Sequence, residues 1–222
     1  MATGALPGSA ANRGARNLLA IGLLVVAAAA VVRFIWHYAA PYFLNYGEQQ
    51  FGQYGYWPHR FRLLTHISGG IVALTCGTLQ LWTGLRQKAM NFHRWIGRIY
   101  LVGAAIGITG AFLMAVFTKP RSFGVSLMAL ATAWILTTGI AWAAILRGRV
   151  ELHKEWMVRS YLVAFAFVIF RVISDNMPWL MARIGSNPDD AATSVGWLCW
   201  VVPLAVYEVI LQSRRLFAKQ TA

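Results

Sequence analysis

Two histidines occupy matching places in a pair of similar segments that lie sixty residues apart. Residues 92–101 read FHRWIGRIYL and residues 152–162 read LHKEWMVRSYL, so the second copy has one extra residue. His93 and His153 are therefore equivalent positions of an internal repeat. Imidazole is a common ligand of haem iron and of other transition metals. A repeat that supplies the same ligand twice indicates one site with two imidazoles.

Cations accompany both histidines in the sequence. A b-type haem needs two neutral imidazoles that face each other across a slot, and it needs cations for its propionates. We take His93 and His153 as the candidate haem or metal ligands. The candidate partners of the haem b propionates are Arg86, Arg94, Arg98 and Arg159.

Other interpretations of these residues remain open. A zinc or iron site would add Glu151 or Glu155 to the two histidines, because three or four nitrogen and oxygen ligands suit these metals. A purely structural interpretation also stands, because a histidine at the water boundary needs no ligand and Arg and Trp commonly anchor helix ends. His66 is a third candidate ligand, since an imidazole inside a membrane span indicates a functional site.

The composition places all of these residues in a membrane protein. Of the 222 residues, 58% are hydrophobic and 12% are charged, whereas soluble domains carry about 25% charged residues. A helix of about 20 apolar residues crosses a bilayer. Runs of sufficient length are present at residues 17–34, 63–85, 95–117, 123–146, 156–173 and 194–212. The sequence predicts an all-α, polytopic membrane protein with six transmembrane helices.

The repeat extends to whole helical hairpins. The second run ends next to Arg86, seven residues before His93, and the fourth ends next to Arg147, six residues before His153. We expect runs two to five to form a four-helix core of two repeated hairpins, with the first and sixth runs peripheral. The implied twofold axis along the membrane normal would bring the two histidines together. Close packing is expected at two sets of glycines, Gly70, Gly77 and Gly84 and Gly103, Gly107 and Gly110.

The distribution of charge predicts an orientation. A net charge of +13 could indicate nucleic acid. With the N-terminus in the cytoplasm, however, thirteen cations lie at the inner side and seven at the outer side, which is the bias of cytoplasmic loops. We therefore expect no nucleic acid and take the lipid bilayer and its anionic lipids as partners. The predicted location is the bacterial inner membrane, with both termini cytoplasmic and both histidines at the inner side.

The chain divides into a membrane domain and two ends. The predicted parts are a disordered cytoplasmic N-terminus (1–16), the six-helix membrane domain (17–213) and a basic cytoplasmic tail (214–222). Within the domain, residues 36–62 form an outer loop rich in aromatic side chains, which favour the headgroup zone. The first run could be a cleaved signal peptide, but its continuation into Phe34, Ile35 and Trp36 favours a retained helix.

A set of residues between positions 66 and 171 carries a resemblance to a known family. They are His66, Gly70, Gly77, Gln80, Arg86, His93, Arg94, Gly97, Arg98, Tyr100, His153, Trp156, Met157, Arg159, Tyr161 and Arg171. In these residues the chain resembles a bacterial family of predicted membrane proteins, the domain-of-unknown-function family 2306. The resemblance implies a fold and no activity.

The architecture is more loosely similar to the six-helix transmembrane b-type cytochromes that pass electrons from ascorbate. That similarity implies a haem between core helices two and four, with His93 and His153 as its ligands. His66 would lie on core helix one, but core helix three has no histidine. The resemblance therefore implies at most one haem with two imidazoles.

We therefore expect electron transfer through a single b-type haem at the cytoplasmic side, with a quinone as a candidate partner. Two alternatives stay open. A haem-free accessory or assembly subunit of a larger membrane complex would use the aromatic loop and the first and sixth helices as contact surfaces. A small transporter would use His66 and Arg171 as polar groups in its pathway. Motifs of soluble enzymes, such as a P-loop, HExxH or CxxC, are absent from the sequence.

Overall fold

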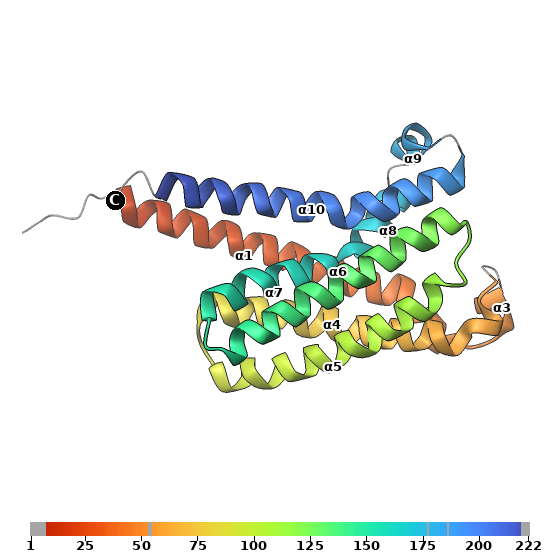
Figure 1. Ribbon diagram of the computed structural model, residues 1–222, viewed down its shortest axis with the longest axis horizontal. Helices are drawn as coiled ribbons and strands as arrows, with labels where there is room; N and C mark the ends of the chain where they lie inside the picture. The colour runs from red at the N-terminus through yellow and green to blue at the C-terminus, as the bar shows by residue number, and fades with distance from the viewer. Residues whose placement is uncertain (1–7, 53–54, 177, 186, 219–222) are drawn as a thin grey trace, which may run out of the picture.

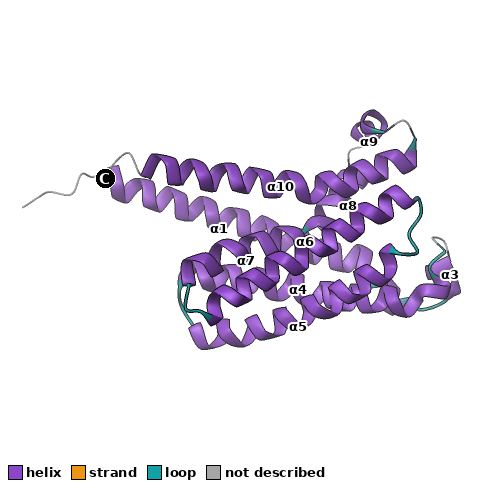
Figure 2. Ribbon diagram, in the orientation of Figure 1, coloured by secondary structure: helices purple, strands orange, loops and turns teal. Residues whose placement is uncertain are grey.

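The computed structural model describes residues 8–52, 55–176, 178–185 and 187–218, and every regular element within them is a helix (Figure 1, Figure 2). Six candidate spans are long and apolar enough to cross a membrane. Their helices are α1 (Gly8–Phe34), α4 (Arg60–Arg86), α5 (Met90–Ala115), α6 (Arg121–Leu146), α7 (Val150–Ala164) with α8 (Ala166–Asn176), and α10 (Pro188–Ala218). Each overlaps a predicted run, so the prediction of an all-α, six-span membrane protein is confirmed.

The helices α4 to α7 form a four-helix bundle. Both α4 and α6 pack against α5 and against α7, which places α5 and α7 diagonally across the bundle (Figure 1). The pairs α4–α5 and α6–α7 are the two repeated hairpins that the sequence predicts. We call the end with the α4–α5 and α6–α7 turns the turn end. The opposite end, next to α3 and α9, is the cap end (Figure 1).

The tightest contact of the bundle joins the backbones of α4 and α5. A Cβ atom built on Gly69 would lie 2.1 Å from the backbone nitrogen of Gly107 and 2.6 Å from the carbonyl oxygen of Gly103. A Cβ atom on Gly110 would lie 2.4 Å from the backbone nitrogen of His66. Small residues allow such close approach of helices in a membrane. Glycine is therefore required at these positions because the opposing helix occupies the space of a side chain.

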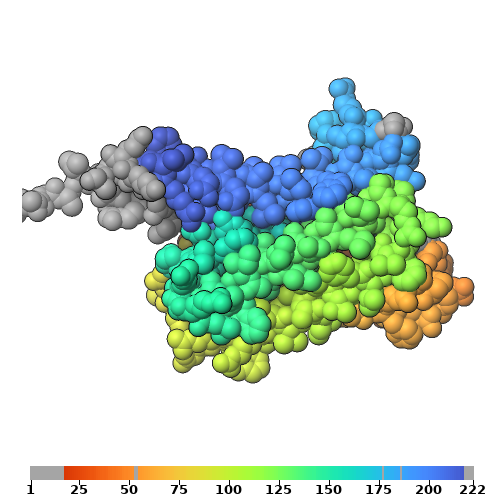
Figure 3. Space-filling model, viewed as in Figure 1, coloured from red at the N-terminus to blue at the C-terminus, as the bar shows by residue number. Residues whose placement is uncertain are grey.

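The first and last spans lie at the periphery, as the sequence predicts. Helix α1 packs against α4 and α8, and α10 packs against α6, α7, α8 and α9. Figure 3 shows α10 along the outside of the α6–α7 hairpin. Many of their apolar side chains are exposed, for example Leu18, Val26 and Val209. In a bilayer these side chains contact lipid, which is as apolar as they are.

The aromatic segment between α1 and α4 packs over the cap end. Its elements are η1 (Ile35–Ala39), α2 (Pro41–Leu44), α3 (Glu48–Gly52) and η2 (Trp57–His59), and the short α9 (Pro178–Ile184) precedes α10. Phe51 of α3 is fully buried and packs with Leu63 of α4 and Met114 of α5. The rings of Tyr42 and Trp57 lie 5.2 Å and 6.0 Å from its ring. The segment therefore covers the α4–α5 hairpin, in addition to presenting aromatic side chains at the predicted membrane boundary.

Both described ends of the chain lie at the turn end (Figure 1). Helix α1 begins at Gly8, inside the segment 1–16 for which the sequence predicts disorder, and residues 1–7 lie outside the described residues. Helix α10 continues to Ala218, inside the predicted tail 214–222, and residues 219–222 lie outside the described residues. An even number of spans places both ends on one side.

Candidate functional site

His93 lies in the first turn of α5 and is attached to α4, the preceding helix of its own hairpin. Its Nδ1 atom lies 2.8 Å from the Thr83 hydroxyl oxygen. The side-chain amide of Gln80 donates a hydrogen bond to the His93 backbone carbonyl. The ring also lies beside Gly84, since a Cβ atom there would be 3.5 Å from its Cε1 atom. These contacts fix the ring at the turn end of the bundle.

His153 repeats this arrangement in the second hairpin. Its Nδ1 atom lies 2.9 Å from the carbonyl oxygen of Ala141 on α6. A carbonyl oxygen only accepts hydrogen bonds, so Nδ1 of His153 carries the proton. The Thr83 hydroxyl lies 2.9 Å from the Leu79 carbonyl oxygen, to which it donates, so it can accept from Nδ1 of His93. In a neutral ring, a proton on Nδ1 leaves the Nε2 lone pair available to a metal.

The two histidines lie in the same register on the diagonal helices. His93 precedes Tyr100 of α5 by seven residues, and His153 precedes Ser160 of α7 by seven residues. The side-chain oxygens of Tyr100 and Ser160 lie 2.6 Å apart. Seven residues are nearly two helical turns, or about 10 Å along the axis. Both histidines therefore lie about two turns from this contact, toward the turn end, with the His93 ring against α4 and the His153 ring against α6.

Within the described residues, no three His, Cys, Asp or Glu side chains gather to hold a metal ion. Glu151 instead pairs with Lys154 at 2.7 Å, and Glu155 pairs with Arg215 at 2.6 Å. Both carboxylates that could have joined His93 and His153 as metal ligands are therefore paired with cations. A site made of His93 and His153 alone would suit a cofactor that brings its own metal ligands.

The four candidate arginines separate into two groups. The guanidinium of Arg86 lies 4.1 Å from the centre of the Trp82 ring, and Arg86, Arg94 and Arg98 are exposed. Their positions follow from α4 ending at Arg86 and α5 beginning four residues later at Met90. These three arginines lie in the last turn of α4 and the first half of α5. Their exposed positions leave them available to an anionic group.

Arg159 is buried and serves a different contact. Its Nε atom lies 2.5 Å from the Glu208 carboxylate of α10, and its guanidinium lies 4.6 Å from the centre of the Trp156 ring. The pair lies 49 residues apart in the sequence and joins α7 to α10. Sequence reasoning missed it, although two opposite charges inside apolar runs are a signal that they meet.

His66 belongs to a separate place near the cap end. Its Nδ1 atom donates to the Gly107 carbonyl oxygen at 2.9 Å, and its ring lies 6.0 Å from that of Phe167. His66 and Thr83, the anchor of His93, are separated by about 25 Å along α4, given 1.5 Å per residue. His66 therefore cannot share a ligand with His93. Arg171, its proposed companion in a transport pathway, lies on α8 over the ring of Tyr38.

The repeated tyrosines tie one hairpin to the other. Tyr100 is fully buried, bonds Ser160 of α7 and accepts a hydrogen bond from the Trp134 indole of α6. Ser160 in turn lies 2.7 Å from the Thr138 hydroxyl. The equivalent Tyr161 of α7 reaches α4 by a 2.6 Å contact with Thr78. The repeat therefore uses histidine within a hairpin and tyrosine between hairpins.

These residues fall within the part of the chain that matches a known family model. The model, described as a predicted membrane protein (DUF2306), matches residues 63–211, about two thirds of the chain. The chain belongs to this family. No curated protein and no solved structure matches the chain. The looser similarity to cytochromes therefore has no support from these comparisons. The DUF2306 region contains His66, His93 and His153, together with all four candidate arginines.

Membership of the DUF2306 family makes the chain an integral membrane protein of unknown function. The matched region begins near the start of α4 and ends within α10, so it contains nearly the whole four-helix bundle. Helix α1 and the aromatic segment precede it. The repeated histidines and tyrosines are thus features of the family region of the fold.

Proposed function

We propose that this DUF2306 protein is a membrane electron-transfer protein that holds one b-type haem between His93 and His153. The supporting observation is the placement of the two imidazoles. They lie on diagonal helices in the same register, and each is anchored through Nδ1, which leaves Nε2 for the iron. A haem bound there would supply one-electron chemistry by changing the oxidation state of its iron.

Each surrounding residue has a defined task in this proposal. Thr83 and the Ala141 carbonyl orient the imidazoles and strengthen them as ligands by accepting their Nδ1 protons. The exposed Arg86, Arg94 and Arg98 hold the propionates by charge-assisted hydrogen bonds. Arg159 is left out of this set because Glu208 already pairs with it.

A lipid-soluble quinone is the electron partner that suits a site at the bilayer boundary. The excess of cations at the turn end supports a cytoplasmic location for that end in a bacterial inner membrane. Electrons would then enter or leave on the inner side. The same cations favour anionic lipids around the turn end.

Histidine variants test the proposal. Purified wild-type protein should give the reduced-minus-oxidised absorption bands of low-spin haem b. His93→Ala and His153→Ala should each lose the bands or convert the remaining haem to a high-spin form. His66→Ala and His37→Ala are matched controls that should keep the bands. Bands of equal size in all four variants would refute the ligand assignment.

The anchor of His93 gives a second test with a graded result. Thr83→Ala should lower haem affinity about 10- to 100-fold, the usual effect of removing a group that orients a metal ligand. Thr83→Ser keeps the hydroxyl and should restore the affinity. Equal affinities for the alanine and serine variants would show that the hydroxyl does not orient His93.

A haem-free accessory subunit is the second candidate, and one observation favours it. The side chains of the repeat already have partners within the protein, since the tyrosines join the hairpins and Arg159 holds α10. Their presence is thereby explained without a cofactor. Purification in mild detergent should then yield a stoichiometric protein partner and none of the visible absorption bands of haem.

A further inference from the structure

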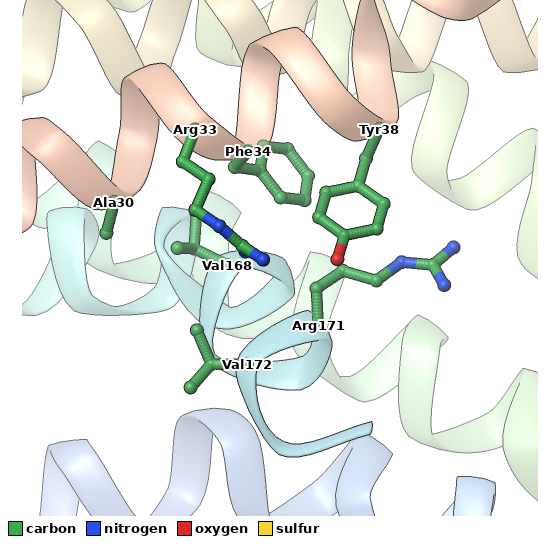
Figure 4. A pocket seen from close by; sticks show the side chains of 7 residues that line it. All are labelled: Ala30, Arg33, Phe34, Tyr38, Val168, Arg171 and Val172. Carbon is green, nitrogen blue, oxygen red and sulfur yellow. The ribbon is translucent and has the colours of Figure 1, made fainter. Parts of the chain in front are cut away.

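A small crevice at the cap end lies between α1 with η1 and α8. Its volume is about 50 Å³ and its walls include Arg33, Phe34 and Tyr38 on one side and Val168 and Arg171 on the other (Figure 4). In Figure 4 the Arg33 side chain extends from α1 toward α8, and the Tyr38 hydroxyl points toward α8. The Arg171 side chain extends past Tyr38, away from Arg33, so the crevice has apolar walls with one cation on each side of Tyr38 (Figure 4).

The arginines of the crevice make no direct ion pair in the described part of the chain, and the nearest carboxylate, Asp175, lies at its edge on the Tyr38 hydroxyl. Within the described residues, neither Arg33 nor Arg171 has a carboxylate oxygen within 4.0 Å. Asp175, four residues after Arg171, accepts a hydrogen bond from the Tyr38 hydroxyl instead. The guanidinium of Arg171 lies 5.0 Å from the centre of the Tyr38 ring. Ionisable groups within membrane spans are costly unless an opposite charge or water accompanies them.

The depth of the crevice matches the headgroup zone. It lies near the end of the first apolar run, and the neighbouring Trp36 is 68% exposed, as expected of a tryptophan at the membrane boundary. Two other wall residues of the crevice, Val168 and Phe34, belong to the apolar contact between α1 and the core. A molecule that fills the crevice would thus place a charged group near water and an apolar part along α1 and α8.

We propose that this crevice binds the phosphate group of an anionic phospholipid. Guanidinium groups form strong, directional hydrogen bonds with phosphate oxygens, and the small volume suits a phosphate better than a large ring. An acyl chain would lie beside the exposed Val172 of α8. The bound lipid joins α1 to the core, where the direct contact is a small cluster around Val31, Leu74 and Val168.

The consequence is a lipid-dependent attachment of α1. Zwitterionic phosphatidylcholine carries a quaternary ammonium group beside its phosphate, which the arginines repel. Anionic phosphatidylglycerol has no such group and should be preferred. Inorganic phosphate shares the charge but has no chain to bury, so it should bind more weakly.

The test uses the purified full-length chain in detergent with added lipid. Phosphatidylglycerol should raise the thermal unfolding midpoint and remain bound in native mass spectrometry, whereas phosphatidylcholine and inorganic phosphate should do so much less. The variant Arg33→Gln/Arg171→Gln should lose about tenfold or more in affinity for phosphatidylglycerol, because it loses charge-assisted hydrogen bonds from both sides. Lys119→Gln/Arg183→Gln removes two exposed charges at the same end and should keep the wild-type affinity.

Several outcomes would overturn the proposal. Equal retention of phosphatidylglycerol and phosphatidylcholine by wild type would exclude recognition of charge. An equal loss in the control variant would assign the effect to net charge alone. A full effect of inorganic phosphate would indicate a free-anion site, and a protein partner lost in the Arg33→Gln/Arg171→Gln variant without any change in lipid would indicate a protein interface.

A fallback covers the case in which the double glutamine variant does not fold. Arg33→Lys/Arg171→Lys keeps both charges but loses the paired hydrogen bonds of guanidinium. It should bind phosphatidylglycerol more weakly than wild type at an unchanged net charge. Wild-type affinity in this variant would contradict the proposed contact of guanidinium with phosphate.

Discussion

Replacing Gly69 with alanine places a methyl group where the structure has the backbone of α5. The added carbon would lie 2.1 Å from the Gly107 nitrogen and 2.5 Å from its Cα atom, well below the 3.4 Å at which ordinary contact begins. Backbone atoms cannot rotate away as a flexible side chain can. Helices α4 and α5 would therefore have to move apart. At the neighbouring Gly70, by contrast, an added Cβ meets nothing within 4 Å.

The two substitutions should change stability in opposite directions. Separating α4 from α5 by about 1 Å gives up a quarter to a half of the dispersion attraction along the contact, and forced overpacking typically costs about 1–3 kcal/mol. Alanine is favoured over glycine in a helix by about 1 kcal/mol. We expect Gly69→Ala to destabilise the protein by about 2 kcal/mol or more. Gly70→Ala should be neutral or stabilising by up to about 1 kcal/mol.

Thermal unfolding in detergent, followed by tryptophan fluorescence, measures this difference. A loss of about 2 kcal/mol lowers the unfolding midpoint of a chain of this size by roughly 4–8 °C. Equal midpoints for the two variants would refute the backbone contact between α4 and α5. A larger loss in Gly70→Ala would show that α4 presents a different face to α5.

Three further predictions concern other contacts. Tyr100→Phe should lower stability by about 0.6 kcal/mol and at most about 1.7 kcal/mol, the average and the maximum measured for hydrogen bonds between membrane helices, and the same change in a Ser160→Ala background should cost clearly less. Glu208→Gln should destabilise more than Arg159→Gln in thermal unfolding, because it leaves a buried guanidinium with only the longer 3.9 Å contact to Glu155; the opposite order would contradict the assigned burial. Phe51→Ala should cost about 3 kcal/mol by emptying the aromatic cap, and hydrogen exchange should rise first at the cap end; a rise confined to the turn end would argue against that packing.

The glycines show how far spacing alone predicts packing. Gly70, Gly77 and Gly84 recur every seven residues, and the sequence predicts one packing face from them. The structure uses Gly77, which lies against Tyr161, and Gly84, which lies beside His93, but leaves Gly70 open. A straight helix drifts by about 20° per seven residues, so Gly70 is turned by about 40° from the face of Gly84, and Gly69 lies against α5 in its place. Only the crossing of α4 and α5 in space decides which glycine is covered.

The partners of the repeat show a second limit. Duplication made His93 and His153 recognisable, and helical periodicity placed them on corresponding helices. Their anchors were not recognisable, because a threonine or a backbone carbonyl in an apolar run gives no sign of its partner. Opposite charges in two apolar runs suggest that Arg159 and Glu208 have partners, but which residues meet depends on where α10 packs.

Haem content tests the central claim most directly. We expect the purified full-length protein, produced in cells supplied with a haem precursor, to contain about one b-type haem per polypeptide in a pyridine haemochrome assay, since two imidazoles complete one iron. The His93→Ala/His153→Ala variant should contain none while it remains folded by circular dichroism. Wild-type protein that is folded, monodisperse and free of haem would contradict the assignment of His93 and His153 as ligands.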